Sequence, residues 1–148
     1  MRFAAKDFYE LSVGELYEIL KSRTEVFLLE QNIVCMDMDD VDYDSRHYFY
    51  EEDGRVVAYL RAYYDAERQR VVHVGRVLTL QHGVGLGRAL MEASIADIVQ
   101  KMPCDMLTLH SQEYAIGFYE KFGFVVVSDT FMEEGIPHVE MIRKIDHL

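Results

Sequence analysis

Apolar residues recur every three to four positions near the start of the chain, from Ser12 to about Glu30. This spacing predicts an amphipathic helix, because residues three and four apart share one face of an α-helix. Ser12 is a suitable N-cap, and Glu15 follows it by three residues, which is the capping-box pattern. The pattern allows a break near Arg23. The apolar positions of this helix are Val13, Leu16, Ile19, Leu20, Val26 and Phe27.

The pattern then changes to short apolar runs separated by turn residues, which is typical of β-hairpins. An acidic stretch, Met36–Asp44, precedes these runs and has the composition of a loop. The runs Arg46–Glu51 and Val56–Tyr64 flank an Asp-Gly pair, which favours a tight hairpin turn. A second hairpin is predicted to turn at Ala66–Gln69 and to continue as the strand Val71–Leu80.

Helical spacing resumes after a glycine-rich loop and ends before Pro103. We place on one stripe of this helix Leu86, Ala89, Leu90, Ala93, Ala96 and Val99. The remaining elements are predicted as a strand Met106–Leu109, a helix Glu113–Phe122 stopped by Gly123, and two closing strands, Phe124–Ser128 and Val139–Ile145. This order, in 148 residues that are 50% apolar, predicts a single domain of the α+β class, a sandwich around one mixed sheet.

The chain carries a formal net charge of −11, from 15 basic and 26 acidic residues. This charge repels phosphate backbones, so we expect no nucleic-acid partner and instead a cationic small molecule or a basic peptide. No apolar run approaches the roughly 18 residues of a membrane span, and the first residues lack the apolar stretch of a signal peptide. We therefore expect a cytoplasmic protein with no membrane partner. Cys35 and Cys104 lack metal-site spacing and are expected to be reduced thiols.

Three alternate glycines, Gly83, Gly85 and Gly87, interrupt an apolar strand-like run. Glycine permits a sharp turn that aims successive N–H groups at one point, where the positive end of the following helix also lies. The loop therefore has the features of a cradle for a phosphate-bearing ligand. It departs from the dinucleotide fingerprint, which needs a glycine where Arg88 stands, and from the nucleotide-triphosphate loop, which needs Gly-Lys-Ser/Thr. The alternative is an ordinary flexible turn between a strand and a helix.

A second motif reads Phe-Tyr-Glu-Lys-Phe-Gly-Phe at positions 118–124. Together with the preceding strand and the Gly-x-Gly-x-Gly-Arg-x-Leu loop, it resembles the GNAT superfamily of N-acetyltransferases over nearly the whole chain. Two further stretches, at positions 23–32 and 134–141, are similar to the ElaA-type branch. The resemblance implies a GNAT-type mixed, mostly antiparallel central sheet flanked by helices as an α/β/α sandwich, and it implies acetyl-coenzyme A as the acyl donor.

The resemblance also implies a set of donor-binding residues. In the family, the glycine motif holds the pyrophosphate and pantetheine of acetyl-coenzyme A, and the second motif supplies a tyrosine beside the thioester sulfur. Carried over to this chain, Tyr119 would face the sulfur, and Gln112 takes the position where the family often has an asparagine near the pantetheine. The implied donor-binding residues are Leu78, Thr79, Leu80, Gly83, Val84, Gly85, Leu86, Gly87, Arg88, Gln112 and Tyr119.

Acetyl transfer to an amine needs a neutral nucleophile, a polarised thioester carbonyl and a proton for the leaving thiolate. Tyr119 can supply that proton, since a free phenol has a pKa of about 10; the alternative for it is a core aromatic at helical spacing. A backbone N–H of the strand before the loop could polarise the carbonyl.

For the base, the ElaA-type resemblance favours His138 and Glu30, with His110 as a third candidate. Each could instead be a hydrogen-bonded structural residue. Arg76 could pair with Glu30 or a substrate carboxylate, or form a buried ion pair.

The acidic stretch matches part of a calcium loop at Asp40, Asp42 and Asp44, but Ser45 stands where that loop needs a glycine. The favoured interpretation is a solvated acidic rim, positions 37–44, that attracts cationic acceptors. No bound metal is expected.

The sequence therefore predicts an acetyl-coenzyme A-dependent N-acetyltransferase that transfers acetyl directly to a primary amine of a small molecule or peptide. A noncatalytic acyl-coenzyme A sensor and a calcium-binding or scaffolding domain are the alternatives. Exposed strand edges make a homodimer plausible. The acceptor and the identity of the base are left open.

Overall fold

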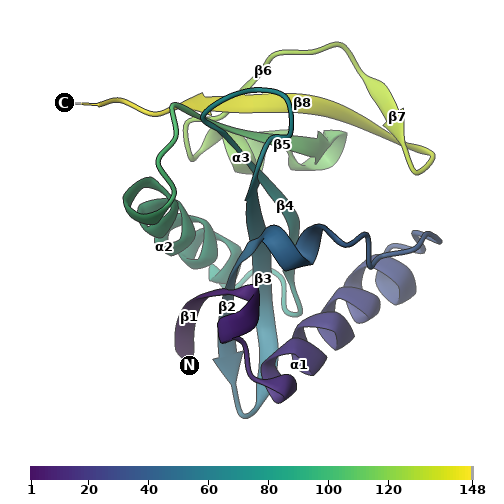
Figure 1. Cartoon of the computed structure of the whole chain (residues 1–148). Helices are drawn as coiled ribbons and strands as arrows, with labels where there is room; N and C mark the ends of the chain where they lie inside the picture. Colours follow the sequence, from purple (N-terminus) through teal and green to yellow (C-terminus); the bar gives the residue numbers. More distant parts are fainter. Residues whose placement is uncertain (148) are drawn as a thin grey trace.

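The computed structural model describes residues 1–147, which form one continuous sheet with helices on both faces (Figure 1). The strands lie in the order β1-β2-β3-β4-β5-β8-β6, and β7 also pairs with β8. Neighbouring strands are antiparallel except for β4 and β5, which are parallel. The predicted α+β class is confirmed. The strands are β1 (Arg2–Asp7), β2 (Arg46–Glu52), β3 (Arg55–Tyr64), β4 (Val71–Thr79), β5 (Met106–Gln112), β6 (Val125–Val126), β7 (Phe131–Glu133) and β8 (Ile136–Lys144).

Helix α1 (Val13–Arg23) begins at the predicted capping box. Ser12 Oγ accepts the N–H of Glu15 at 3.0 Å, and Glu15 Oε1 accepts the N–H of Ser12 at 2.9 Å. After Arg23 the chain continues as a π-helix, Thr24–Glu30, so the predicted break is a change of hydrogen-bond pattern rather than an end.

Successive side chains of the strands alternate between two core layers, as the period of a β-strand requires. Phe49 and Tyr59 pack under α1 with Ile19, while Tyr48 and Leu60 belong to the larger layer on the other face. That second face is covered by α2 (Leu86–Lys101), and Figure 1 shows α1 and α2 on opposite sides of β2, β3 and β4. The predicted three-layer sandwich is confirmed.

The stripe predicted for α2 is partly wrong. Ala96 and Val99 face solvent, because the buried stripe runs along a neighbouring line of the helix. The buried positions are Leu86, Leu90, Met91, Ser94, Ile95 and Ile98.

The predicted Asp-Gly hairpin is confirmed, and Asp53 and Gly54 both adopt the left-handed conformation with φ of 51° and 78°. Two strands were missed: the edge strand β1, which pairs with β2, and the short β7. The predicted strand at 124–128 shrinks to β6, and the predicted helix at 113–122 is a 3₁₀ turn followed by α3 (Ile116–Glu120). Within residues 1–147, no helix has the length and apolarity needed to cross a bilayer.

Candidate active site

The two central strands, β4 and β5, pair only at their first residues. Val71, Val72 and His73 face Met106, Leu107 and Thr108, and the strands part beyond these three pairs. From there β4 stays bound to β3, while β5 stays bound to β8. The sheet therefore opens into a fork at its centre, which leaves backbone groups on both inner edges available to a ligand.

A β-bulge shapes the β4 arm of the fork. Arg76 and Val77 together oppose the single residue Leu60 of β3, and Arg76 adopts a left-handed φ of 52°. Further along, the N–H of Leu80 donates to Val57 O at 2.8 Å, so the backbone of Leu80 points to β3. Because alternate residues of an antiparallel strand point their backbone groups to opposite sides, the N–H of Thr79 faces the fork. Of Leu78, Thr79 and Leu80, the three residues predicted to contact a pantetheine arm through their backbone, Thr79 is the one whose N–H faces the fork.

A cavity of about 170 Å³ lies at the fork. Below it is called the fork cavity. Its wall combines both arms of the fork with the end of the π-helix, the segment after it, α3 and the β7–β8 turn. The lining residues that bear on the chemistry are Arg76, His110, Gln112, Tyr119, Glu133 and His138.

Tyr119 lines this cavity from α3 and is 9% exposed. Its ring packs edge-on against Phe118 and Phe124. Burial raises the pKa of Tyr119 above that of a free phenol, and no residue among 1–147 hydrogen bonds to its hydroxyl. Tyr119 is thus a core aromatic that also keeps its proton at the cavity wall, and this position fits either interpretation of the residue.

The glycine loop (Gly83–Arg88) leads into the N-terminus of α2. Gly83 and Gly85 both have φ of 77°, and a Cβ at either position would meet no atom within 4 Å. The glycines are therefore required by the backbone conformation, and the space beside them is open to a ligand. Gly85 is the N-cap of α2 and offers no side chain to its first N–H groups. The loop thus presents unsatisfied donors at the positive end of a 16-residue helix, which suits a phosphate group.

The other residues predicted around the loop differ in their surroundings. Leu86 is buried in the core, whereas Val84 is exposed. Arg88 is exposed and forms an ion pair with Glu92 at 2.9 Å. Gln112 lies at the end of β5, where its Nε2 donates to Gln31 Oε1 at 3.2 Å. This hydrogen bond joins β5 to the segment after the π-helix across the fork cavity.

Of the three predicted base candidates, His138 and His110 line the fork cavity and Glu30 does not. Glu30 lies at the glycine loop, because its Oε1 is 2.8 Å from Nε2 of His82. Glu30 and His138, the two alternative base candidates that the resemblance favours, therefore lie in different parts of the site. The structure instead places Glu133, which the sequence analysis missed, between the two histidines.

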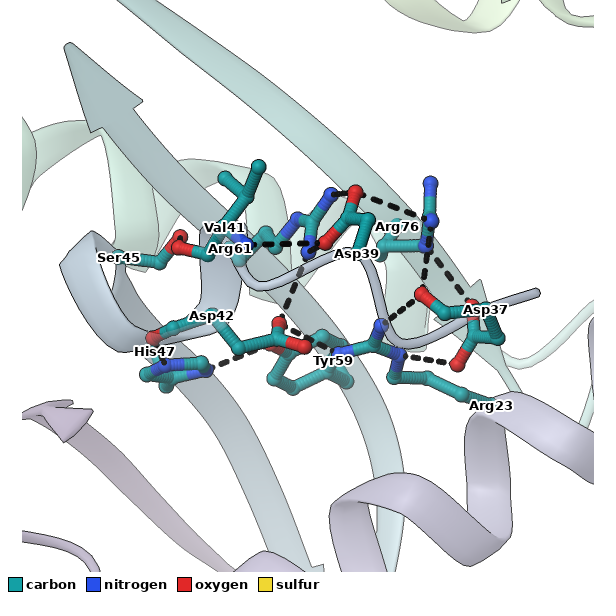
Figure 2. Close-up of polar contacts among 10 residues, drawn as sticks. All are labelled: Arg23, Asp37, Asp39, Val41, Asp42, Ser45, His47, Tyr59, Arg61 and Arg76. Atoms are coloured by element: carbon teal, nitrogen blue, oxygen red, sulfur yellow. Dashed lines mark hydrogen bonds and ion pairs between the residues drawn. The ribbon is translucent and has the colours of Figure 1, made fainter.

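Beside the fork cavity, three arginines and three aspartates form a neutral network (Figure 2). Asp37 accepts from Arg23 Nε and Arg76 Nε, each at 2.9 Å, and Asp42 Oδ1 accepts from Arg23 at 2.7 Å and from Arg61 at 2.9 Å. The sixth member, Asp39, binds Arg61 through both of its oxygens. The side chain of Arg23 is fully buried, so these ion pairs compensate its charge.

This network bears on three sequence interpretations. Of the alternatives left open for Arg76, the structure has a structural ion pair, with Asp37 and Asp39, and not the pair with Glu30. The segment 37–44, called the strap below, is held against the fold rather than forming a solvated acidic rim. Three of its carboxylates are paired with arginines. The calcium loop, the alternative that the sequence does not favour, would need Asp42 as a ligand, and Oδ1 of this carboxylate is bound by two arginines. Of the two cysteines, Cys104 is buried and Cys35 is exposed on the cavity wall.

The fold and this site together define an acyltransferase of the GNAT class. The family model for the acetyltransferase (GNAT) domain matches residues 17–145. The chain belongs to this family.

Curated relatives place it near ElaA. The chain is 34% identical over 140 residues to protein ElaA of Escherichia coli, with 92% of each chain covered. It is 37% identical over 145 residues to a UPF0039 protein of Schizosaccharomyces pombe, with 95% of each covered. Among solved structures, ElaA of Escherichia coli superposes with a TM-score of 0.89 at 31% identity, covering 97% of this chain and 99% of that one. An acyl-CoA N-acyltransferase from Pseudomonas aeruginosa gives the same TM-score at 32% identity and the same coverage.

Proposed function

We propose that this protein is an acetyl-coenzyme A-dependent N-acetyltransferase that transfers acetyl directly to a primary amine of a cationic small molecule or peptide. The observation that carries the proposal is that Tyr119 and His138 line the same cavity, at the point where β4 and β5 part. A hydroxyl that holds a proton and an imidazole that can take one are the two groups that such a transfer requires.

The glycine loop supports acetyl-coenzyme A as the donor. Its first two glycines leave open space, and the N-terminus of α2 supplies donors for a pyrophosphate. Thr79 would hold the pantetheine arm through its backbone, and Gln112 would lie beside that arm. When bound, acetyl-coenzyme A supplies the acetyl group as an activated thioester.

Two side chains of the protein would then each transfer a proton, His138 as the base and Tyr119 as the acid. His138 would take one proton from the acceptor's ammonium at Nε2, and this proton would pass to solvent. The amine nitrogen loses its second proton to solvent as the amide bond forms and the bond from carbon to sulfur breaks. Tyr119 would give its hydroxyl proton to the sulfur that leaves with the bonding electron pair, and it would regain a proton from solvent. One proton is thus released per acetyl transferred, and no covalent enzyme intermediate is required.

The charges at the cavity favour a cationic acceptor. Glu133 lines it from the end of β7 and Glu134 from the turn that follows, and Arg76 is the arginine at its wall. The charge of Arg76 is already neutralised by its ion pair with Asp37. The two glutamates therefore give a negative charge to the part of the cavity wall where we place the acceptor. An ammonium group would be attracted there, and a carboxylate would be repelled.

The test is to follow free thiol release from acetyl-coenzyme A while varying the added amine. We expect diamines and amino-terminal peptide amines to accelerate release above the acceptor-free rate, and amines with a neighbouring carboxylate to do so less. Donor binding without acceleration by any amine would refute the enzyme and favour the sensor. Absence of donor binding would refute both.

A further inference from the structure

Three ionisable side chains meet at the outer wall of the fork cavity, one from each of three paired strands. His110 comes from β5, His138 from β8, and Glu133 from β7. Glu133 Oε1 accepts from His110 Nδ1 at 2.8 Å, and its Oε2 lies 3.6 Å from His138 Nε2. The side chain of His138 is 9% exposed, whereas those of Glu133 and His110 are 43% and 37% exposed. The cluster therefore extends from a nearly buried side chain, His138, to two side chains that are partly exposed to solvent.

The hydrogen bond at the other side of the ring fixes the tautomer of His138. Its Nδ1 lies 2.7 Å from the carbonyl oxygen of Ile136, and a carbonyl can only accept, so Nδ1 carries the proton. In the neutral ring Nε2 is then unprotonated and can accept a proton. At 3.6 Å, Glu133 is too far to hydrogen bond to Nε2 but close enough to act on it as a charge.

Glu133 is itself held in place. The N–H of His110 binds one of its oxygens, which lowers the pKa of Glu133 and raises the pKa of His110. Glu133 is therefore ionised at neutral pH, and its second oxygen, which has no hydrogen-bond donor among residues 1–147, is the one that faces His138. Phe131 supports the arrangement, because its ring lies edge-on to His110 and stacks on His138.

We propose that Glu133, anchored by His110, is a positioning residue that stabilises the imidazolium formed when His138 takes the acceptor's proton. The proposal rests on the proposed function and deepens it. In this step an N–H bond of the acceptor ammonium breaks, its electron pair stays on nitrogen, and the proton forms a new bond to His138 Nε2. The carboxylate of Glu133 then faces the positive ring, and the neutral amine is free to attack.

Other charged groups also face this cluster. Glu134 lies next to Glu133 on the β7–β8 turn, and Asp37 and Arg76 face the cavity from the strap and β4. Glu140 of β8 and Arg68 act on His110 from its other side. The carboxylate of Asp37 is bound by arginines, so Glu133 and Glu134 are the carboxylates free to act on His138 from within the cavity.

A purely structural role for Glu133 is the competing explanation, since its bond to His110 ties β7 to β5. Glu133→Gln separates the two roles, because a glutamine oxygen can still accept from His110 while the charge is removed. Glu120→Gln is the matched control: it removes an exposed carboxylate that does not line the fork cavity and forms no ion pair within residues 1–147.

The experiment measures kcat and KM as a function of pH, by thiol release with the best amine, for wild type and both variants. For Glu133→Gln we expect the acid limb of the kcat profile to move to lower pH, because the substitution removes the negative charge that faces His138 Nε2 at 3.6 Å. The plateau of kcat should fall about tenfold, because the base is weaker. KM should change less than kcat, and in a His138→Gln background the second substitution should have no further effect on kcat.

An active wild type whose profile is not moved by Glu133→Gln, or is moved equally by Glu120→Gln, would overturn the role of Glu133 alone. A wild type that releases no thiol with any amine would overturn the proposed function and this role with it. The two failures are therefore distinguished by the wild-type measurement.

Discussion

Gly87 packs directly against the ring of Phe118, so the glycine loop and the second sequence motif touch. A Cβ at residue 87 would lie 3.3 Å from Cζ of Phe118 and 3.7 Å from Cγ2 of Thr79. Phe118 has little room to move, since its ring also packs against Tyr119 and Phe122. The third glycine of the loop is therefore explained by packing between α2 and α3, whereas Gly83 and Gly85 are explained by backbone conformation.

Gly87→Ala should destabilise the protein, because overpacking costs about 1–3 kcal/mol and the gain in helix propensity returns at most about 1 kcal/mol. In a Phe118→Leu background the contact is relieved, and the same substitution should become neutral or stabilising. Urea unfolding of the four proteins measures this coupling. An equal effect of Gly87→Ala in both backgrounds would show that the contact does not restrict residue 87.

Tyr119→Phe should lower kcat about 10²-fold with little change in donor affinity, because it removes the proton offered to the leaving sulfur and keeps the ring in the core. Tyr114→Phe is the control, since Tyr114 also lines the fork cavity but is 77% exposed. Steady-state kinetics of both variants checks this. A kcat for Tyr119→Phe equal to that of the control would return Tyr119 to a structural role.

Asp42→Asn should lower the free energy of unfolding by about 3 kcal/mol, because it removes the carboxylate that two buried guanidinium groups share and leaves the network with an uncompensated positive charge. Arg23 and Arg61, the two arginines that lose their shared partner, have side chains that are 0% and 3% exposed. Asp44→Asn serves as the control, because Asp44 is exposed and forms no ion pair within residues 1–147. Similar unfolding midpoints in urea for the two variants would contradict the importance assigned to the network.

Acid should weaken the network through Asp39. The hydrogen bond from Arg61 lowers the pKa of Asp39 to about 2. Because an unfolded aspartate has a pKa of about 3.9, the stabilisation is complete above that value and is lost as the pH falls through about 2. Asp39→Asn should therefore be less stable than wild type at pH 7, and the difference should shrink between about pH 4 and pH 2. Urea unfolding across this range measures it, and a constant difference would refute the assignment.

The elements with strong local signals could be predicted from the sequence. The Ser12–Glu15 cap and the Asp53-Gly54 turn depend on residues within four positions of each other, so a local pattern contains the information. β1 was missed because it is an edge strand whose burial depends on β2, and the paired residues of the two strands are 39 to 49 positions apart in the sequence. β7 was missed because it has three residues and exists only through its pairing with β8.

The residues of the candidate site also fall into two groups, those in local sequence motifs and those brought together by contacts between distant positions. The glycine loop and Tyr119 belong to contiguous motifs, and both could be found. The pairing of Asp37 and Asp42 with arginines joins residues 14 to 39 positions apart, so the acidic stretch looked solvated when only its composition was read. Glu133 had no signal of its own, although its proximity to the Glu-Gly turn before His138 could have marked it as a neighbour of that histidine.

A calorimetric titration of acetyl-coenzyme A into wild type, Gly85→Asp and Gly85→Asn tests the donor site most directly. Aspartate and asparagine both tolerate the left-handed conformation of residue 85 and both can cap α2, so the two variants differ mainly in charge. A carboxylate about 4 Å from a phosphate costs roughly 1–4 kcal/mol, so Gly85→Asp should weaken donor binding tenfold or more while Gly85→Asn stays near wild type. Equal affinities for the two variants, or no binding by wild type, would contradict the assignment of this loop to the donor's pyrophosphate.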